Sequence, residues 1–95
     1  MNSEGDMRAL SVEEREEIFI DIARQLDRTA LESMVEGNRK FAMVSKNMAD
    51  AIFISADELA RDDSHTPVHV MKQARELVRQ FEAVHPHRMR SHAIH

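Results

Sequence analysis

Apolar residues recur along most of the chain with the three-to-four-residue spacing of an α-helix. The first such stretch begins with Ser11 and Glu14, which have the spacing of a capping box. Several acidic residues follow in the first turns, where the helix dipole favours negative charge. The apolar positions behind them are Ile18, Phe19, Ile22, Ala23, Leu26 and Ala30. This pattern predicts a first helix over residues 12–27.

The second apolar stretch is the longest, and it predicts a helix over residues 30–60. We expect a break between the first and second helices near Thr29, because Thr29 and Glu32 form a second pair with capping-box spacing. Its apolar positions approach a heptad seam with one column formed by Leu31, Asn38, Ser45, Ile52 and Leu59. Gly37 lies within the stretch and costs a helix about 1 kcal/mol relative to Ala. A kink or short turn at residues 36–38 is therefore the main alternative to a continuous helix.

A third helix is predicted over residues 67–84. Thr66 and Pro67 suit a helix start, since a hydroxyl residue can cap and proline loses no hydrogen bond in the first turn. The residues that follow form a single apolar stripe of Val70, Met71, Ala74, Leu77, Val78 and Phe81. Pro86 then stops the helix near Val84. Alternating β-branched runs are absent from the sequence, so we expect no strand.

These elements predict an all-α fold, a small bundle of about three helices with a long central helix. Residues 1–10 are expected to form a flexible arm, residues 11–85 a single helical domain, and residues 86–95 a tail rich in His and Arg. A continuous central helix would be about 45 Å long at 1.5 Å per residue. A compact domain of this size is only about 26 Å wide. We therefore expect the exposed end of that helix to pair with a second copy in a homodimer.

Composition narrows the chemistry that the chain can perform. The 95 residues include no Cys, which excludes disulfides and thiolate metal sites and fits a reducing compartment. Only two Gly residues occur, so glycine-rich loops for nucleotide phosphates are excluded. The start of the chain lacks the basic and apolar regions of a signal peptide, and no apolar run is long enough to span a membrane. We expect a cytoplasmic protein that needs no cofactor and no membrane.

Several apolar residues of the second stretch lie off its seam and need cover from another surface. They predict an interaction surface in which polar Asn38 pairs with Asn38 of a second copy, or with a backbone group of that copy, and fixes the register. The residues expected at this interface are Asn38, Phe41, Met43, Val44, Met48, Ile52, Phe53 and Ile54.

All six histidines lie in the last third of the chain, which raises a site-based alternative. Imidazoles are common ligands of Zn, Ni and Cu, and the candidate ligands are His85, His87, His92 and His95. A second version places a phosphorylated imidazole at His69, with Lys72 close by in the sequence to stabilise the phosphate.

The same third of the chain is basic, although the whole chain carries a formal net charge of −4. The candidate basic patch comprises Lys72, Arg75, Arg79, Arg88 and Arg90. It supports a further alternative, a DNA-binding regulator, but the net negative charge and the absence of Trp and Tyr disfavour nucleic-acid binding.

Taken together, these patterns favour a non-enzymatic helical module for protein–protein interaction. A regulator, an adaptor or an accessory subunit fits this description, and its expected partners are a second copy of the chain and another protein. A chain this short buries a limited area by itself, so association is a natural source of additional buried surface.

Overall fold

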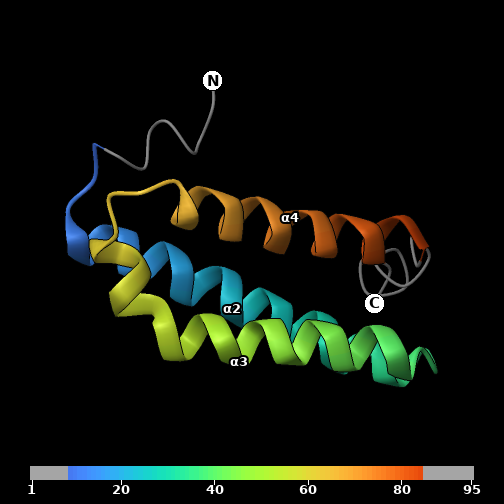
Figure 1. The fold of residues 1–95 in the computed structure, drawn as a ribbon. Helices are drawn as coiled ribbons and strands as arrows, with labels where there is room; N and C mark the ends of the chain where they lie inside the picture. The colour runs from blue at the N-terminus through green and yellow to red at the C-terminus, as the bar shows by residue number, and fades with distance from the viewer. Residues whose placement is uncertain (1–8, 85–95) are drawn as a thin grey trace, which may run out of the picture.

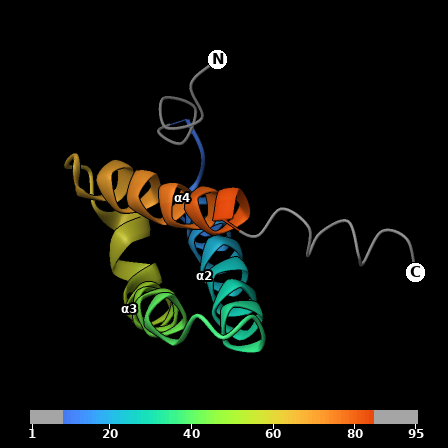
Figure 2. The same cartoon turned by 90° about the vertical axis from the view of Figure 1, so that its right-hand side faces the viewer.

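The computed structural model describes residues 9–84, and in this range it contains three α-helices and no strand. Helix α2 spans Val12–Val35, α3 spans Arg39–Arg61 and α4 spans Thr66–Val84. The helices α2 and α3 run antiparallel as a hairpin, and α4 lies across one face of that hairpin (Figures 1 and 2). The predicted all-α bundle of three helices is confirmed. The predicted tail over 86–95 and most of the predicted arm over 1–10 lie outside the described residues.

The start of α2 forms as the sequence predicts. The Glu14 backbone N–H donates to Ser11 Oγ at 3.1 Å, and the Ser11 N–H donates to Glu14 Oε1 at 2.8 Å. The hydrogen bond from the Ser11 backbone N–H, and after it one from the Ser11 side chain, favour the charged carboxylate and hold the pKa of Glu14 below its ordinary value. Leu10, within the predicted arm, packs against the core, and its carbonyl accepts from Arg15 Nε at 3.2 Å.

The predicted helix over 30–60 is wrong in its first part, because α2 continues to Val35 and the chain reverses at residues 36–38. The predicted break near Thr29 does not occur. Thr29 is buried inside α2, and its carbonyl accepts from Ser33 Oγ at 2.7 Å. Ala30 and Leu31 are good helix formers, so nothing interrupts the helix at this point. The exposed end of a long central helix, from which dimerisation was inferred, is therefore absent.

Gly37 allows the chain to leave α2 and reverse direction. It has φ +86°, a left-handed conformation that costs other L-residues about 1–2 kcal/mol. Its N–H donates to the Met34 carbonyl at 3.1 Å, while the Asn38 N–H donates to the Ser33 carbonyl at 2.8 Å. These two bonds define a Schellman motif, which satisfies the last carbonyls of α2.

Asn38 also begins the next helix. Its side-chain Oδ1 accepts from the Phe41 backbone N–H at 3.2 Å, as an N-cap does. The polar side chain predicted to face its own copy across a dimer thus has a partner within its own chain.

The hairpin is closed by small side chains. Five of the seven buried residues of α3 are Ala or Ser, namely Ala42, Ser45, Ala49, Ala56 and Ala60. Small residues let two helices approach closely. Ser45 Oγ donates to the Leu26 carbonyl at 2.7 Å, and both groups are buried. At the other end of the hairpin, half-buried Arg15 donates from Nη1 to the Ala60 carbonyl at 3.1 Å, which ties the start of α2 to the end of α3.

The third helix adds larger side chains to the core. It begins at Thr66, one residue before the predicted start, and buries Met71, Ala74, Val78 and Phe81 as its stripe predicts. The helices α2 and α3 contact each other much more extensively than either contacts α4. In residues 9–84, no helix is both long and apolar enough to cross a membrane.

The turn leads to a stability prediction. Gly37→Ala is expected to lower the free energy of unfolding by about 1 kcal/mol, because alanine is strained at positive φ while the unfolded chain loses some entropy. Nothing lies within 4 Å of an added Cβ, so the cost comes from the backbone alone. Gly37→Asn should cost less, since Asn tolerates this conformation. Urea denaturation measures both; equal stability of Gly37→Ala and the parent would contradict the turn.

Candidate functional site

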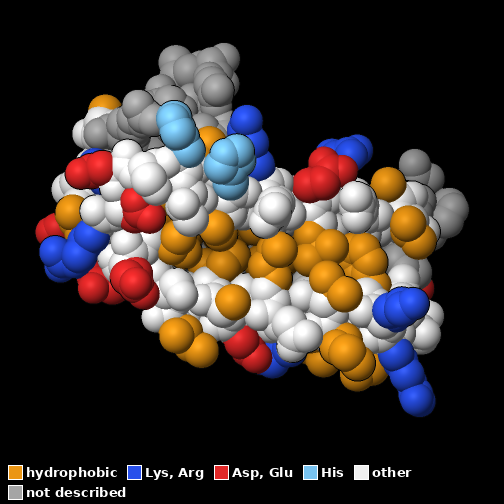
Figure 3. Space-filling view, in the orientation of Figure 1, with side chains coloured by type: hydrophobic (Ala, Val, Ile, Leu, Met, Phe, Trp, Pro, Cys, Tyr) orange, Lys and Arg blue, Asp and Glu red, His pale blue; other side chains and the backbone are white. Residues whose placement is uncertain are grey.

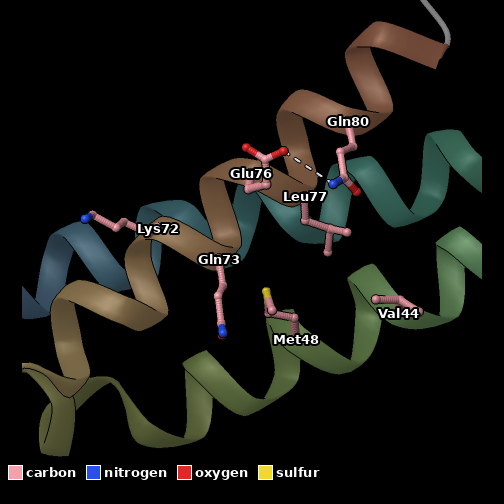
Figure 4. A pocket seen from close by; sticks show the side chains of 7 residues that line it. All are labelled: Val44, Met48, Lys72, Gln73, Glu76, Leu77 and Gln80. Carbon is pink, nitrogen blue, oxygen red and sulfur yellow. Dashed lines mark hydrogen bonds between the residues drawn. The ribbon is translucent and has the colours of Figure 1, made fainter.

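A groove opens between α3 and α4. Val44 and Met48 line it from α3, and Leu77 lines it from α4, where Gln73 and Leu77 point toward α3 (Figure 4). Its volume is about 540 Å³. A band of hydrophobic side chains runs between the two helices on this face (Figure 3). The groove exists because α4 directs its buried stripe into the core and leaves part of the adjoining side of α3 uncovered.

On the rim of the α3–α4 groove, the charge of Glu76 is offset by Arg79. Glu76 accepts from Arg79 Nε at 3.0 Å and from Gln80 Nε2 at 3.3 Å. Arg79 holds the pKa of Glu76 below its ordinary value, chiefly through the side-chain hydrogen bonds. The other polar residues on the lining are Gln73, Gln80 and Lys72, so Lys72 is the one lining cation.

A second groove, which we call the tip groove, lies between the end of α2 and the start of α3. It has a volume of about 600 Å³, and α2 and α3 alone line it. Its residues are Asp27, Ala30, Leu31, Met34, Arg39, Ala42, Met43 and Lys46. Three of its apolar side chains are well exposed, Leu31 at 68%, Met34 at 55% and Met43 at 64%.

One ion pair crosses an end of the tip groove. Lys46 Nζ lies 2.9 Å from Asp27 Oδ1 across the hairpin and 3.2 Å from Asp50 Oδ1 on its own helix. Hydrogen bonds to these carboxylates, Asp27 first, raise the pKa of Lys46 above its ordinary value. Arg39, on the opposite part of the lining, is exposed and makes no described ion pair within residues 9–84.

The predicted interface residues fall into three groups. Met43, Val44 and Ile54 are exposed. Phe41, Met48, Phe53 and Asn38 are half-buried, and the Phe41 ring centroid lies 5.7 Å from that of Phe81. Ile52 is buried in the core at 3% exposure and offers no surface to a partner.

Sequence reasoning missed Leu31, Met34 and Val35 as surface residues. All three are more than half exposed. Periodicity placed them inside a long helix, whereas they lie in the last turns of α2. Gly37, two residues beyond, is the signal that locates this end.

The histidines and basic residues are only partly within the described chain. His65 and His69 are exposed, whereas His85, His87, His92 and His95 lie outside residues 9–84. No group of three potential metal ligands comes together in the described part. Lys72, Arg75 and Arg79 are exposed on α4 and Arg79 pairs with Glu76, while Arg88 and Arg90 also lie outside.

Comparisons with known proteins give no relative. No protein-family model, no curated protein and no solved structure matches this chain.

The tip groove predicts a contrast between two leucines of α2. Leu31→Ala should change the free energy of unfolding by no more than about 0.5 kcal/mol, because the side chain is exposed. Leu26→Ala, the matched change at a fully buried position, should lower it by about 2–5 kcal/mol. Urea denaturation distinguishes the two, and a comparable loss in both variants would show that Leu31 belongs to the core.

Proposed function

We propose that this protein is a non-enzymatic interaction module that forms a homodimer through the α3–α4 groove. The observation that carries the proposal is the open groove with apolar walls from Val44, Met48 and Leu77. Burying such a surface contributes roughly 25 cal/mol per Å² of apolar area. A small domain buries a smaller fraction of its surface on folding than a large one. A domain of 95 residues therefore gains proportionally more stability from burying this groove. The lack of Cys is consistent with a role in a reducing compartment, for which we propose the cytoplasm.

The charges and amide groups on the rim of this groove suit contact with a second copy of the chain. In a two-fold dimer, the same surface patch meets itself, so unpaired charges near the centre would repel each other. Here Arg79 offsets the charge of Glu76, which leaves Lys72 as the one lining cation. The amides of Gln73 and Gln80 can both donate and accept hydrogen bonds, so each can pair with an amide of the other copy.

Neither alternative function has comparable support within residues 9–84. A histidine-centred site would need further ligands near His65 or His69, and none gathers there in this range. Of the residues in the candidate basic patch, Arg79 is paired with Glu76, and Arg88 and Arg90 lie outside this range.

Val44→Glu tests the proposed dimer. Val44 is 48% exposed and lines the groove, so a carboxylate at this position leaves the monomer folded and places two like charges in the dimer interface. Light scattering after size exclusion, over a dilution series, should give twice the 11.0 kDa chain mass for the parent and one chain mass for the variant.

Ile54→Glu is the matched control. Ile54 lies on the same helix and is 84% exposed, but it does not line the groove. This variant should keep the dimer mass. A parent protein that stays monomeric at all concentrations, or a Val44→Glu protein that stays dimeric, would refute the proposed interface.

A further inference from the structure

The antiparallel hairpin separates charge along its length. The first half of α2 carries a run of acids, Glu13, Glu14, Glu16, Glu17 and Asp21. The end of α3 and the loop after it carry Asp57, Glu58, Asp62 and Asp63. Because the helices are antiparallel, both groups lie at the same end of the hairpin, opposite the turn at residues 36–38 (Figure 1). The tip groove, therefore, lies at the end away from this acidic region.

Cations lie at the start of α3, beside the tip groove, whereas Glu36 lies on the other side of the turn at the end of α2. Arg39 lines the groove, Lys40 is its exposed neighbour in the chain, and neither makes a described ion pair in residues 9–84. Arg28 lies beside it in a smaller hollow, which shares Asp27 and Leu31 with the groove. The acid Asp27 is occupied by Lys46. Glu32 lines a further hollow, between α2 and α4, and Arg28 reaches that hollow as well.

The position of these cations in α3 is unfavourable for the helix itself. Arg39 is the first residue of α3, and the first turn contains no acid. The N-terminus of a helix carries partial positive charge, so cations there lower helix stability by about 0.3–1 kcal/mol each. Residues that oppose local stability often serve binding.

We propose that the tip groove binds an amphipathic helix of a partner protein whose apolar face is flanked by Asp and Glu. Two antiparallel helices form a groove of the shape that accepts a third helix. Ala30 and Ala42 leave room at the floor, and Met34 and Met43 provide flexible side chains that adapt to an apolar face. The flanking acids would meet Arg28 on one side and Arg39 on the other.

A second copy does not suit this groove. A two-fold contact would bring the Arg39 and Arg28 regions of two chains together, and the like charges would repel each other. The inference rests on the proposed function only in that the protein binds other proteins. It does not depend on the homodimer, because the two grooves have different lining residues.

Two synthetic helical peptides of about 18 residues, long enough for about five turns, test the inference. Both carry the same Leu and Met stripe, flanked by Glu in one and by Lys in the other, and a fluorophore reports binding by anisotropy. The Glu-flanked peptide should bind at least about tenfold more tightly, and this preference should weaken as salt screens the charges. No binding of the Glu-flanked peptide, or equal binding of both peptides, would overturn the inference.

The variant Arg28→Glu/Arg39→Glu tests the role of the two cations. It should reverse the preference, so that the Lys-flanked peptide binds more tightly. Both residues are exposed, and Arg39→Glu places an acid where the dipole of α3 favours it, so the variant is expected to fold. Lys72→Glu, a matched charge reversal in the lining of the α3–α4 groove and outside the tip groove, should keep the parent preference. An unchanged preference in the double variant would refute the proposed site.

The same titration on Val44→Glu separates this inference from the proposed dimer. Tight binding of the Glu-flanked peptide by this variant supports the tip groove whatever the oligomeric state. Loss of binding in Val44→Glu, with the parent still binding, would place the peptide in the α3–α4 groove and contradict the inference.

Discussion

The close packing of α2 on α3 determines the rest of the molecule. Small side chains along α3 let the two helices approach, and the buried hydrogen bond from Ser45 to the Leu26 carbonyl fixes how they align. The approach is possible only because the chain reverses within three residues at Gly37. At the far end, Arg15 joins the start of α2 to the last turn of α3. These contacts all lie within α2, α3 and the turn between them, so the two helices themselves define the register of the hairpin.

The same packing explains why apolar surface remains. Each Ala in the seam buries less apolar area than a Leu would, and each buried methylene contributes about 0.8 kcal/mol to stability. The contact between α2 and α3 therefore gives the hairpin limited hydrophobic stabilisation. Met71 and Phe81 of α4 enlarge the core on one face. They do not cover Val44 or reach the tip groove, which α2 and α3 line alone. Both grooves are thus consequences of a three-helix arrangement in which two helices pack tightly and the third covers one face.

Much of the fold could be predicted from the sequence, because helical periodicity is strong in each stretch. The capping box at Ser11 and the apolar stripe of α4 were both located correctly. The error concerned Thr29 and Gly37. The hydroxyl of a capping-box pattern is equally compatible with a buried helix interior, and tertiary packing selects the interior here. Gly37 is compatible with either a kink or a turn, and only its backbone conformation in the structure distinguishes the two.

The candidate sites were less predictable, since they depend on which side of each helix is covered. The residues Met43 and Val44 were identified because they lie off the seam, and both are exposed. Ile52 belongs to the same sequence stretch but faces the core. The tip groove brings together residues that the sequence separates by the turn, Leu31 and Met34 on one side and Arg39 and Met43 on the other. Without the position of the turn, this grouping could not be recognised.

The hairpin is formed by α2 and α3 of one chain. The most direct measurement is an isotope-filtered NOE experiment on a mixture of labelled and unlabelled chains that have been unfolded and refolded together. We expect strong NOEs between Ser45 and Leu26 protons within a chain, and no NOE between Ser45 of one chain and Leu26 of another. Inter-chain NOEs between these residues, together with continuous helical NOEs through residues 34–40, would show a long central helix that exchanges between two chains and would contradict the account.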